Sequence, residues 1–249
     1  MVSVSTNFIP AMHRIIRPFS KLIGLSNQKN EYGNTLNHSS SPSGQRENLE
    51  RKFKNAGFFL LNKVGRENIG DYLEFDVRRG ISLHYMLCTL KLLKLHNSRL
   101  FGFDSFEGMP VIDLIDSGWQ SEAFINDTQF STRILSYKKI DWGRIFLIKG
   151  WFADTLSQKV ALKYNIQKAS FIMVGCDTYS STKQSLIFCE PLIKEIAVVF
   201  FKNWLNENEN VKKAFKEFLE ENPHLKAVKY DSYEPYGEVF VVARNNTGN

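Results

Sequence analysis

Two acidic residues, Asp104 and Asp177, follow apolar runs that predict buried β-strands. Asp177 comes after residues 170–174 and Gly175, and a Ser/Thr cluster at 178–182 then predicts the capped start of a helix. In open α/β sheets, ligands bind at the carboxyl ends of the strands. A carboxylate there can accept a hydrogen bond from a ligand hydroxyl or take up its proton. The sequence therefore predicts a binding or catalytic site at this edge.

A glycine turn precedes these acids. Gly80 lies between a predicted strand and a helix that opens at Ser82. Such a turn allows close backbone approach, and a helix N-terminus favours a carboxylate or phosphate. The turn lacks the glycine fingerprint of nicotinamide enzymes and the Walker sequence, which disfavours a sugar-nucleotide or NAD enzyme. Asp104 ends the second strand, where an acid often holds a ribose diol. An ordinary turn glycine and an exposed loop acid are the alternatives.

Two aromatic residues, Trp151 and Phe152, follow the third predicted strand and Gly150. Planar side chains at this edge of a sheet can flank a purine ring. Aromatic side chains also dominate the buried area of protein cores, so the sequence leaves both interpretations open.

Strands must alternate with helices to bring these residues together. We expect strands at 72–77, 99–103, 145–148, 170–174, 196–201, 226–230 and 238–243, and helices at 49–66, 82–95, 183–193 and 211–221. This order predicts an α/β fold with a mostly parallel sheet and helices on both faces. The last two strands, joined by a turn at 235–237, predict an antiparallel edge hairpin. The stretch 105–144 has weak periodicity, which is typical of a lid or substrate-binding insertion.

The first 48 residues differ from the rest. Residues 1–54 hold most of the net charge of +6. Residues 9–25 carry apolar side chains at helical spacing, but Pro18 interrupts them. This favours an arm packed on its own domain or on a second subunit of a homo-oligomer over a membrane-surface helix. Residues 26–48 are rich in Ser, Asn and Gly, so we assign 1–48 to a basic arm with a flexible linker and 49–249 to the folded domain.

Composition disfavours several classes of protein. The chain beyond the arm is nearly neutral, so no nucleic-acid partner is predicted. No apolar run approaches the ~18 residues of a membrane span, and the N-terminus shows no signal-peptide pattern. The three cysteines are odd in number and lack metal-ligand spacing, which favours reduced thiols. We therefore expect a cytoplasmic protein.

Five blocks of sequence together resemble the macrocin O-methyltransferase-like (TylF/MycF-type) family of class I S-adenosylmethionine-dependent methyltransferases. The blocks are residues 72–83, 101–110, 149–156, 176–183 and 217–223, and the resemblance covers about 69–243. It implies a Rossmann-like seven-stranded sheet, S-adenosylmethionine as cofactor, and O-methylation of a small-molecule hydroxyl on a sugar or secondary metabolite.

The resemblance also implies roles for individual residues. Glu74 would lie near the methionine amino group of the cofactor, and Gly80 and Ser82 beside its carboxylate end. Asp104 would take the ribose hydroxyls, with Ser105 and Phe106 lining the nucleoside. Gly150, Trp151 and Phe152 would lie by the adenine, and Asp177 at the reaction centre.

The chain departs from the family pattern at four positions. Asp76 stands where the family has glycine, and Gly175 where the family has an acid. Lys202 and Asn203 replace an Asp-Asp pair that, in metal-dependent members, holds Mg²⁺ together with the acid at position 177. Mg²⁺ prefers several hard oxygen ligands, and only Asp177 of that set is kept. The resemblance therefore implies a degenerate metal site and no metal cofactor.

Two functional hypotheses follow. In the first, the chain is a metal-independent O-methyltransferase that aligns the acceptor hydroxyl with the sulfonium methyl group. Asp177 or Lys202 would deprotonate the acceptor, and Lys202 would place its charge where the metal was, paired with Asp177. In the second, the chain is a catalytically inactive relative that keeps the fold as a binding or assembly module.

Overall fold

Seven strands form one mixed sheet in the order β3-β2-β1-β4-β5-β7-β6. Strands β1 to β5 run parallel, β7 is antiparallel to β5, and β6 is antiparallel to β7. The strands are β1 (Asp71–Phe75), β2 (Leu100–Asp104), β3 (Ile145–Lys149), β4 (Ala169–Val174), β5 (Ile196–Phe201), β6 (Leu225–Tyr233) and β7 (Gly237–Arg244). The predicted Rossmann-like sheet with an antiparallel edge hairpin is confirmed.

This computed structural model describes residues 42–78, 80–107, 142–205, 209–233 and 237–245. They belong to one compact unit that spans Ser41–Asn249. The predicted helix at 9–25 and most of the predicted insertion at 105–144 lie outside the described residues.

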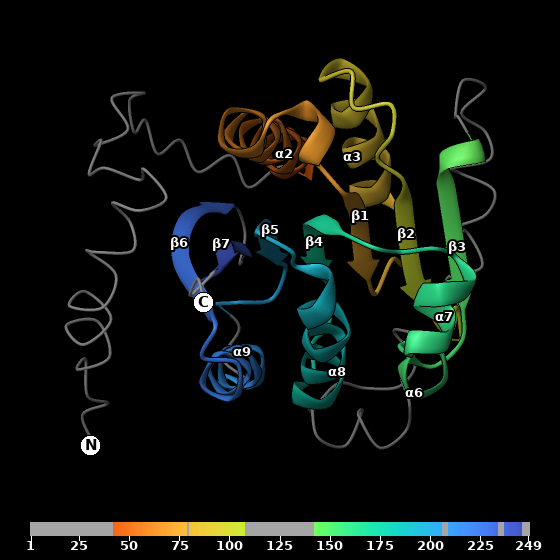
Figure 1. Cartoon of the computed structure of the whole chain (residues 1–249), viewed down its shortest axis with the longest axis vertical. Helices are drawn as coiled ribbons and strands as arrows, with labels where there is room; N and C mark the ends of the chain where they lie inside the picture. Colours follow the sequence, from red (N-terminus) through yellow and green to blue (C-terminus); the bar gives the residue numbers. More distant parts are fainter. Residues whose placement is uncertain (1–41, 79, 108–141, 206–208, 234–236, 246–249) are drawn as a thin grey trace. The chain divides into compact units, whose positions relative to one another are not determined.

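Helices cover both faces of the sheet (Figure 1). In that view α2 and α3 lie above the sheet, and α6 to α9 lie below it. From β1, the chain adds β2 and β3 on one side of the sheet, and from β4 it adds β5 on the other side. Because such crossovers are right-handed, the helices α3 and α8 cover opposite faces of the sheet. The helices are α2 (Pro42–Val64), α3 (Ile81–Leu92), α6 (Phe152–Thr155), α7 (Gln158–Lys163), α8 (Tyr179–Cys189) and α9 (Asn210–Glu221), with short 3-10 turns η1 (Arg66–Asn68), η3 (Trp142–Arg144) and η4 (Glu190–Leu192).

Several element boundaries differ from the sequence-based expectation, and three of them have a clear local reason. Helix α2 begins at Pro42, so residues 42–48, which we assigned to the linker, are helical. Proline suits the first helical turn, because a backbone N–H at that position would have no hydrogen-bond acceptor within the helix and its absence costs nothing. Helix α8 begins at Tyr179 rather than 183, because the Thr178 hydroxyl accepts a hydrogen bond from the Ser181 amide at 3.2 Å. Strand β1 ends at Phe75 because Asp76 adopts a left-handed backbone with φ of 65°.

The sheet is buried on both faces by aromatic side chains. Phe75 stacks on Phe103 with ring centroids 5.3 Å apart, within the core that α8 covers. On the α2 side, Phe53 packs edge-to-face against Phe200 at 4.8 Å and against Tyr72 at 6.1 Å. Strands β1, β4 and β5 consist wholly of buried residues, as expected for central parallel strands.

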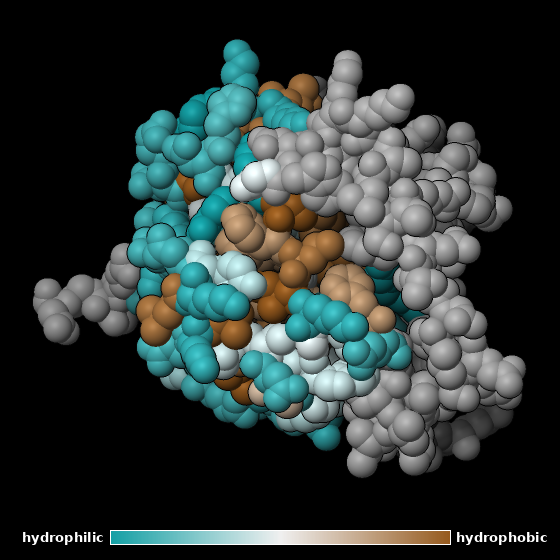
Figure 2. All heavy atoms as spheres, turned by 90° about the vertical axis from the view of Figure 1, so that its right-hand side faces the viewer, coloured by the Kyte–Doolittle hydropathy of each residue, from teal (hydrophilic) through white to brown (hydrophobic). Residues whose placement is uncertain are grey.

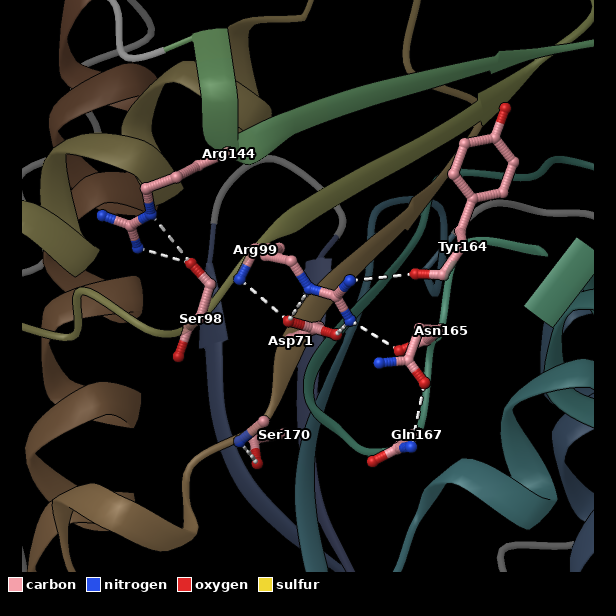
Figure 3. A network of polar contacts seen from close by, with 9 residues as sticks. Asp71, Ser98, Arg99, Arg144, Tyr164, Asn165, Gln167 and Ser170 are labelled. Atoms are coloured by element: carbon pink, nitrogen blue, oxygen red, sulfur yellow. Dashed lines mark hydrogen bonds and ion pairs between the residues drawn. The ribbon is translucent and has the colours of Figure 1, made fainter. Parts of the chain in front are cut away.

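An ion-pair network fixes the amino ends of the central strands (Figure 3). The Arg99 guanidinium contacts the Asp71 carboxylate at 2.6 Å and donates to the carbonyls of Tyr164 and Asn165 at 2.9 and 2.8 Å. These bonds join the starts of β1 and β2 to the loop before β4. Because charged bidentate bonds are the stronger protein hydrogen bonds, the network holds this end of the sheet.

The β3 edge of the sheet exposes apolar side chains. Figure 2 faces that edge and shows an apolar area beside atoms drawn in grey. Two large apolar side chains on β3 and α7 are exposed: Leu147 of β3 is 37% exposed, and Leu162 of α7 is 72% exposed. Among the described residues, no helix combines the length and hydropathy that a membrane crossing requires.

Candidate active site

The loops after β1, β2, β3, β4 and β5 lie side by side at the carboxyl edge of the sheet. Four backbone hydrogen bonds of 2.8–3.1 Å carry the strand pairing into these loops. They run from Asp76 N to Phe103 O, from Gly150 N to Asp104 O, from Gly175 N to Phe75 O, and from Lys202 N to Val174 O. The sheet order reverses between β1 and β4, and that switch point is where open α/β sheets bind ligands.

Asp104 is held ready for a ligand by two backbone amides. The Arg78 amide donates to its Oδ2 and the Phe106 amide to its Oδ1, both at 2.8 Å. Both amides belong to residues with left-handed backbone, with φ of 51° and 53°. Each carboxylate oxygen has a further lone pair for another donor, so this geometry fits two neighbouring hydroxyls such as a ribose diol.

Glu74 is fully buried, with 0% of its side chain exposed. Its Oε2 accepts a 2.7 Å hydrogen bond from the Tyr72 hydroxyl. Its Oε1 accepts one from the Ser82 hydroxyl and lies 3.1 Å from the Lys202 ammonium. Burial and the neighbouring Glu74 raise the pKa of Tyr72 well above its usual value, so that hydroxyl remains a donor. Glu74 is thus a hydrogen-bonded and charge-compensated carboxylate.

Lys202 pairs with Glu74 and fills the space beside Gly175. Its ammonium also donates to the Asp76 carbonyl at 3.4 Å. A Cβ built on Gly175 would lie 3.2 Å from this ammonium, and only 2.7 and 2.8 Å from the carbonyls of Phe75 and Asp76. We had expected Lys202 to pair with Asp177, but the ion pair of Lys202 in the structure is with Glu74, 128 residues away in sequence. The Asn203 amide caps the Gly175 carbonyl at 3.0 Å.

Two carboxylates at this edge of the sheet, Asp76 and Asp177, have a raised pKa. Burial raises the pKa of Asp76 from 3.8 to about 7; Lys202 and Arg78 lower it, and Asp104 and Asp177 add to the rise. Burial likewise raises the pKa of Asp177, while Arg78 and Lys202 lower it. A raised pKa makes a carboxylate a stronger base at neutral pH.

The start of α3 lies next to this cluster. Gly80 precedes the helix with φ of 65°, a left-handed conformation that glycine adopts without strain. The Ser82 side chain points to Glu74, so only its backbone amide, in the first turn, is left for a ligand. The Ser105 hydroxyl accepts from the Glu107 amide at 3.2 Å.

The aromatic pair after β3 divides between core and surface. Phe152 packs edge-to-face on Phe75, with centroids 6.0 Å apart, at the margin of the core. Trp151 is 37% exposed and precedes α6. Gly150, with φ of 143°, connects them to β3. Trp151 is therefore the aromatic side chain of this pair that is accessible to a purine.

The donor set does not fit Mg²⁺. At positions 175, 177, 202 and 203, where the family resemblance places the metal site, the chain offers one carboxylate, Asp177, together with the Asn203 amide, the side-chain-free Gly175 and the Lys202 ammonium. An ammonium repels a divalent cation, and Mg²⁺ requires an octahedral set of oxygen ligands. Within the described part of the chain, no group of three or more His, Cys, Asp or Glu side chains is placed to hold a metal ion.

Sequence reasoning missed two residues of this site. Tyr72 could have been found, because side chains two apart in a strand share a face and Tyr72 therefore lies beside Glu74. Arg78 gave no such signal, since its role depends on a turn that brings its amide to Asp104.

Comparison with known proteins identifies the family. The model of the macrocin-O-methyltransferase (TylF) family matches residues 53–228. No curated protein matches the sequence. Among solved structures, the O-methyltransferase NovP is 17% identical, with a TM-score of 0.59 over 79% of each chain. The calicheamicin methyltransferase CalS11 is 19% identical, with a TM-score of 0.60 over 100% of this chain and 95% of that chain.

An apo structure of CalS11, described as a TDP-rhamnose 3′-O-methyltransferase, is similar over 100% of this chain and 97% of that chain, with 17% identity and a TM-score of 0.52. At these identities the solved structures establish a shared fold, and the family match covers most of the chain. The resemblance inferred from the sequence is thereby confirmed: the chain belongs to the macrocin-O-methyltransferase (TylF) family of methyltransferase enzymes.

Proposed function

We propose that the chain is an S-adenosylmethionine-dependent O-methyltransferase that works without a divalent metal. One observation carries the metal-independent part: the Lys202 ammonium, 3.1 Å from Glu74, occupies the space beside Gly175. The family places its metal-binding acids at positions 202 and 203, where this chain places a cation of its own and an amide. A fixed ammonium supplies positive charge there, but no coordination geometry.

The residues present fit the adenosine part of the cofactor. Asp104 offers two oriented oxygens for the ribose hydroxyls, and Trp151 offers an exposed ring near the purine. The left-handed turn at Gly80 and the first amides of α3 suit a carboxylate. When bound, S-adenosylmethionine supplies an electrophilic methyl group.

Asp177 is our candidate general base. It follows β4 at the switch point of the sheet, and burial raises the pKa of its carboxyl. In the proposed reaction Asp177 would accept the proton of the acceptor hydroxyl while the oxygen takes the methyl group, whose bond to the sulfonium sulfur breaks to leave S-adenosylhomocysteine. Lys202, already paired with Glu74, contributes positive charge near the developing alkoxide. The acceptor we propose is a hydroxyl of a sugar or secondary metabolite.

Calorimetric titration tests the cofactor assignment. S-adenosylmethionine and S-adenosylhomocysteine should both bind the full chain, and Asp104→Asn should weaken both. The control variant is Glu220→Gln, because Glu220 is an exposed side chain of α9 that should not affect binding. If neither compound binds the wild-type chain at millimolar concentration, the proposed function is wrong.

A chelator tests the metal-independent part. Formation of S-adenosylhomocysteine is followed with hydroxylated acceptors, beginning with TDP-rhamnose because CalS11 is described as acting on it. Turnover should be unchanged in excess EDTA and should fall strongly in Asp177→Asn. Loss of turnover in EDTA, restored by Mg²⁺, would contradict metal independence.

The second candidate is a catalytically inactive binding module. The observation that favours it is the burial of Glu74 and its ion pair with Lys202. The family resemblance assigns Glu74 to the cofactor, but the ion pair already compensates its charge. This candidate predicts that S-adenosylhomocysteine fails to bind, or binds without turnover of any acceptor.

A further inference from the structure

Glu74, the acid that the family resemblance assigns to the methionine amino group, is already occupied in this chain. It is 0% exposed and takes hydrogen bonds from the Tyr72 and Ser82 hydroxyls and an ion pair from Lys202. The Lys202 ammonium is the same chemical group that the cofactor would present. A ligand ammonium could reach Glu74 only by breaking a buried ion pair, which is strongly unfavourable.

Asp76 is accessible where Glu74 is not. It lies two residues further along, past the end of β1, and keeps 29% of its side chain exposed. The Arg78 Nε lies 3.9 Å from its carboxylate, which is at the limit of an ion pair. Lys202 contacts the backbone carbonyl of Asp76, at 3.4 Å.

The backbone at Asp76 is also unusual. Its φ of 65° is left-handed, a region that disfavours residues with a Cβ. Strained residues of this kind gather at ligand-binding sites, where the surrounding structure holds them in place. Here the amide of Asp76 is bonded to the Phe103 carbonyl at 3.1 Å, which fixes the residue beside the loop that carries Asp104.

We propose that Asp76, and not Glu74, is the carboxylate that receives the α-ammonium group of the cofactor. This inference rests on the proposed function. Lys202 compensates the charge of the buried Glu74, so Glu74 is not available to a ligand cation. Asp76 offers a more exposed negative charge in its place. Together with Asp104 for the ribose hydroxyls, the edge of the sheet then carries one acid for the ribose and one for the α-ammonium group.

The electrostatics agree with this assignment. Around Asp76, the cations Lys202 and Arg78 do not outweigh burial and the acids Asp104 and Asp177, so the pKa of Asp76 rises to about 7. A ligand cation beside Asp76 would supply the missing compensation.

Two ligands separate the ammonium contact from the rest of the site. S-adenosylhomocysteine carries the α-ammonium group, and 5′-methylthioadenosine lacks the whole amino-acid part but keeps the adenosine. Calorimetry at pH 8 on the full chain should show that Asp76→Asn weakens S-adenosylhomocysteine by about tenfold or more, since a hydrogen bond to a charged group is lost. The affinity for 5′-methylthioadenosine should stay within about twofold of wild type. Asp104→Asn, the matched control, should weaken both ligands.

The outcomes distinguish this inference from the proposed function. Equal affinity of wild type and Asp76→Asn for S-adenosylhomocysteine overturns the inference, as does a loss that is the same for both ligands. Failure of the wild-type chain to bind either ligand overturns the proposed function itself. Asp76→Gly serves as a second variant, because glycine accepts the left-handed backbone, and it should show the same selective loss.

Discussion

Removing the Asp76 carboxylate should stabilise the free protein at pH 8, and by less than half as much at pH 5. Burial raises the pKa of this carboxyl from 3.8 to about 7, so the folded chain binds more protons than the unfolded chain between those values. The contribution of Asp76 to the free energy of unfolding is therefore largest below about pH 4 and falls as the pH rises to about 7, because the folded state disfavours the ionised carboxylate. Asp76→Asn removes this dependence, because an amide does not titrate.

The size of the effect follows from the pKa difference. A change from 3.8 to about 7 corresponds to roughly 4 kcal/mol as an upper bound. Because 29% of the side chain remains exposed, solvent screens the charge, and we expect on the order of 2 kcal/mol at pH 8. Asp76→Gly should gain about 1 kcal/mol more at both pH values, since glycine relieves the strain of a left-handed φ.

Urea denaturation followed by circular dichroism at pH 5 and pH 8 measures these differences. The variants are compared with wild type at each pH, so titration of all other groups cancels. A difference between wild type and Asp76→Asn that is the same at both pH values would refute the reasoning, and so would a variant that is less stable than wild type at pH 8.

Three further variants test the packing of the site and of the opposite edge. Lys202→Met should destabilise the fold by about 3–5 kcal/mol in urea, because it leaves the buried Glu74 carboxylate without its cation; a change below about 1 kcal/mol would contradict the ion pair. Gly175→Ala should cost about 1–3 kcal/mol in the same assay, since its Cβ meets the Phe75 carbonyl at 2.7 Å, and full stability would show that this contact relaxes freely. Arg99→Leu should lower the melting temperature while the affinity for S-adenosylhomocysteine stays constant, and a weakened affinity would contradict the separation of the two edges.

The fold was predictable because its strands are apolar runs with clear ends. Strand β5 matches the expectation at both ends, since Ile196–Phe201 is apolar throughout and polar residues flank it. The hairpin of β6 and β7 was readable for the same reason. Helices α6 and α7 were missed, because four and six residues are too few to show a helical period.

The places of the candidate residues in the fold were predictable, but the contacts between their side chains were not. Asp104 and Asp177 lie at strand ends as expected, because the edge of a parallel sheet follows from strand order alone. The pairing of Lys202 with Glu74 depends on a contact across 128 residues, for which the sequence carries no local signal. The left-handed backbone at Asp76 was not predicted, because glycine is the residue that commonly indicates such a conformation and this position holds aspartate.

The crowding around Gly175 also limits which side chains position 175 can hold. The family pattern has an acid at that position, yet here the carbonyls of Phe75 and Asp76 lie within 2.8 Å of where its Cβ would be, and Lys202 lies at 3.2 Å. A single mutation that introduces an acid meets backbone rather than a movable side chain alone. A carboxylate side chain at position 175 therefore requires the end of β1 and the Lys202 side chain to shift together.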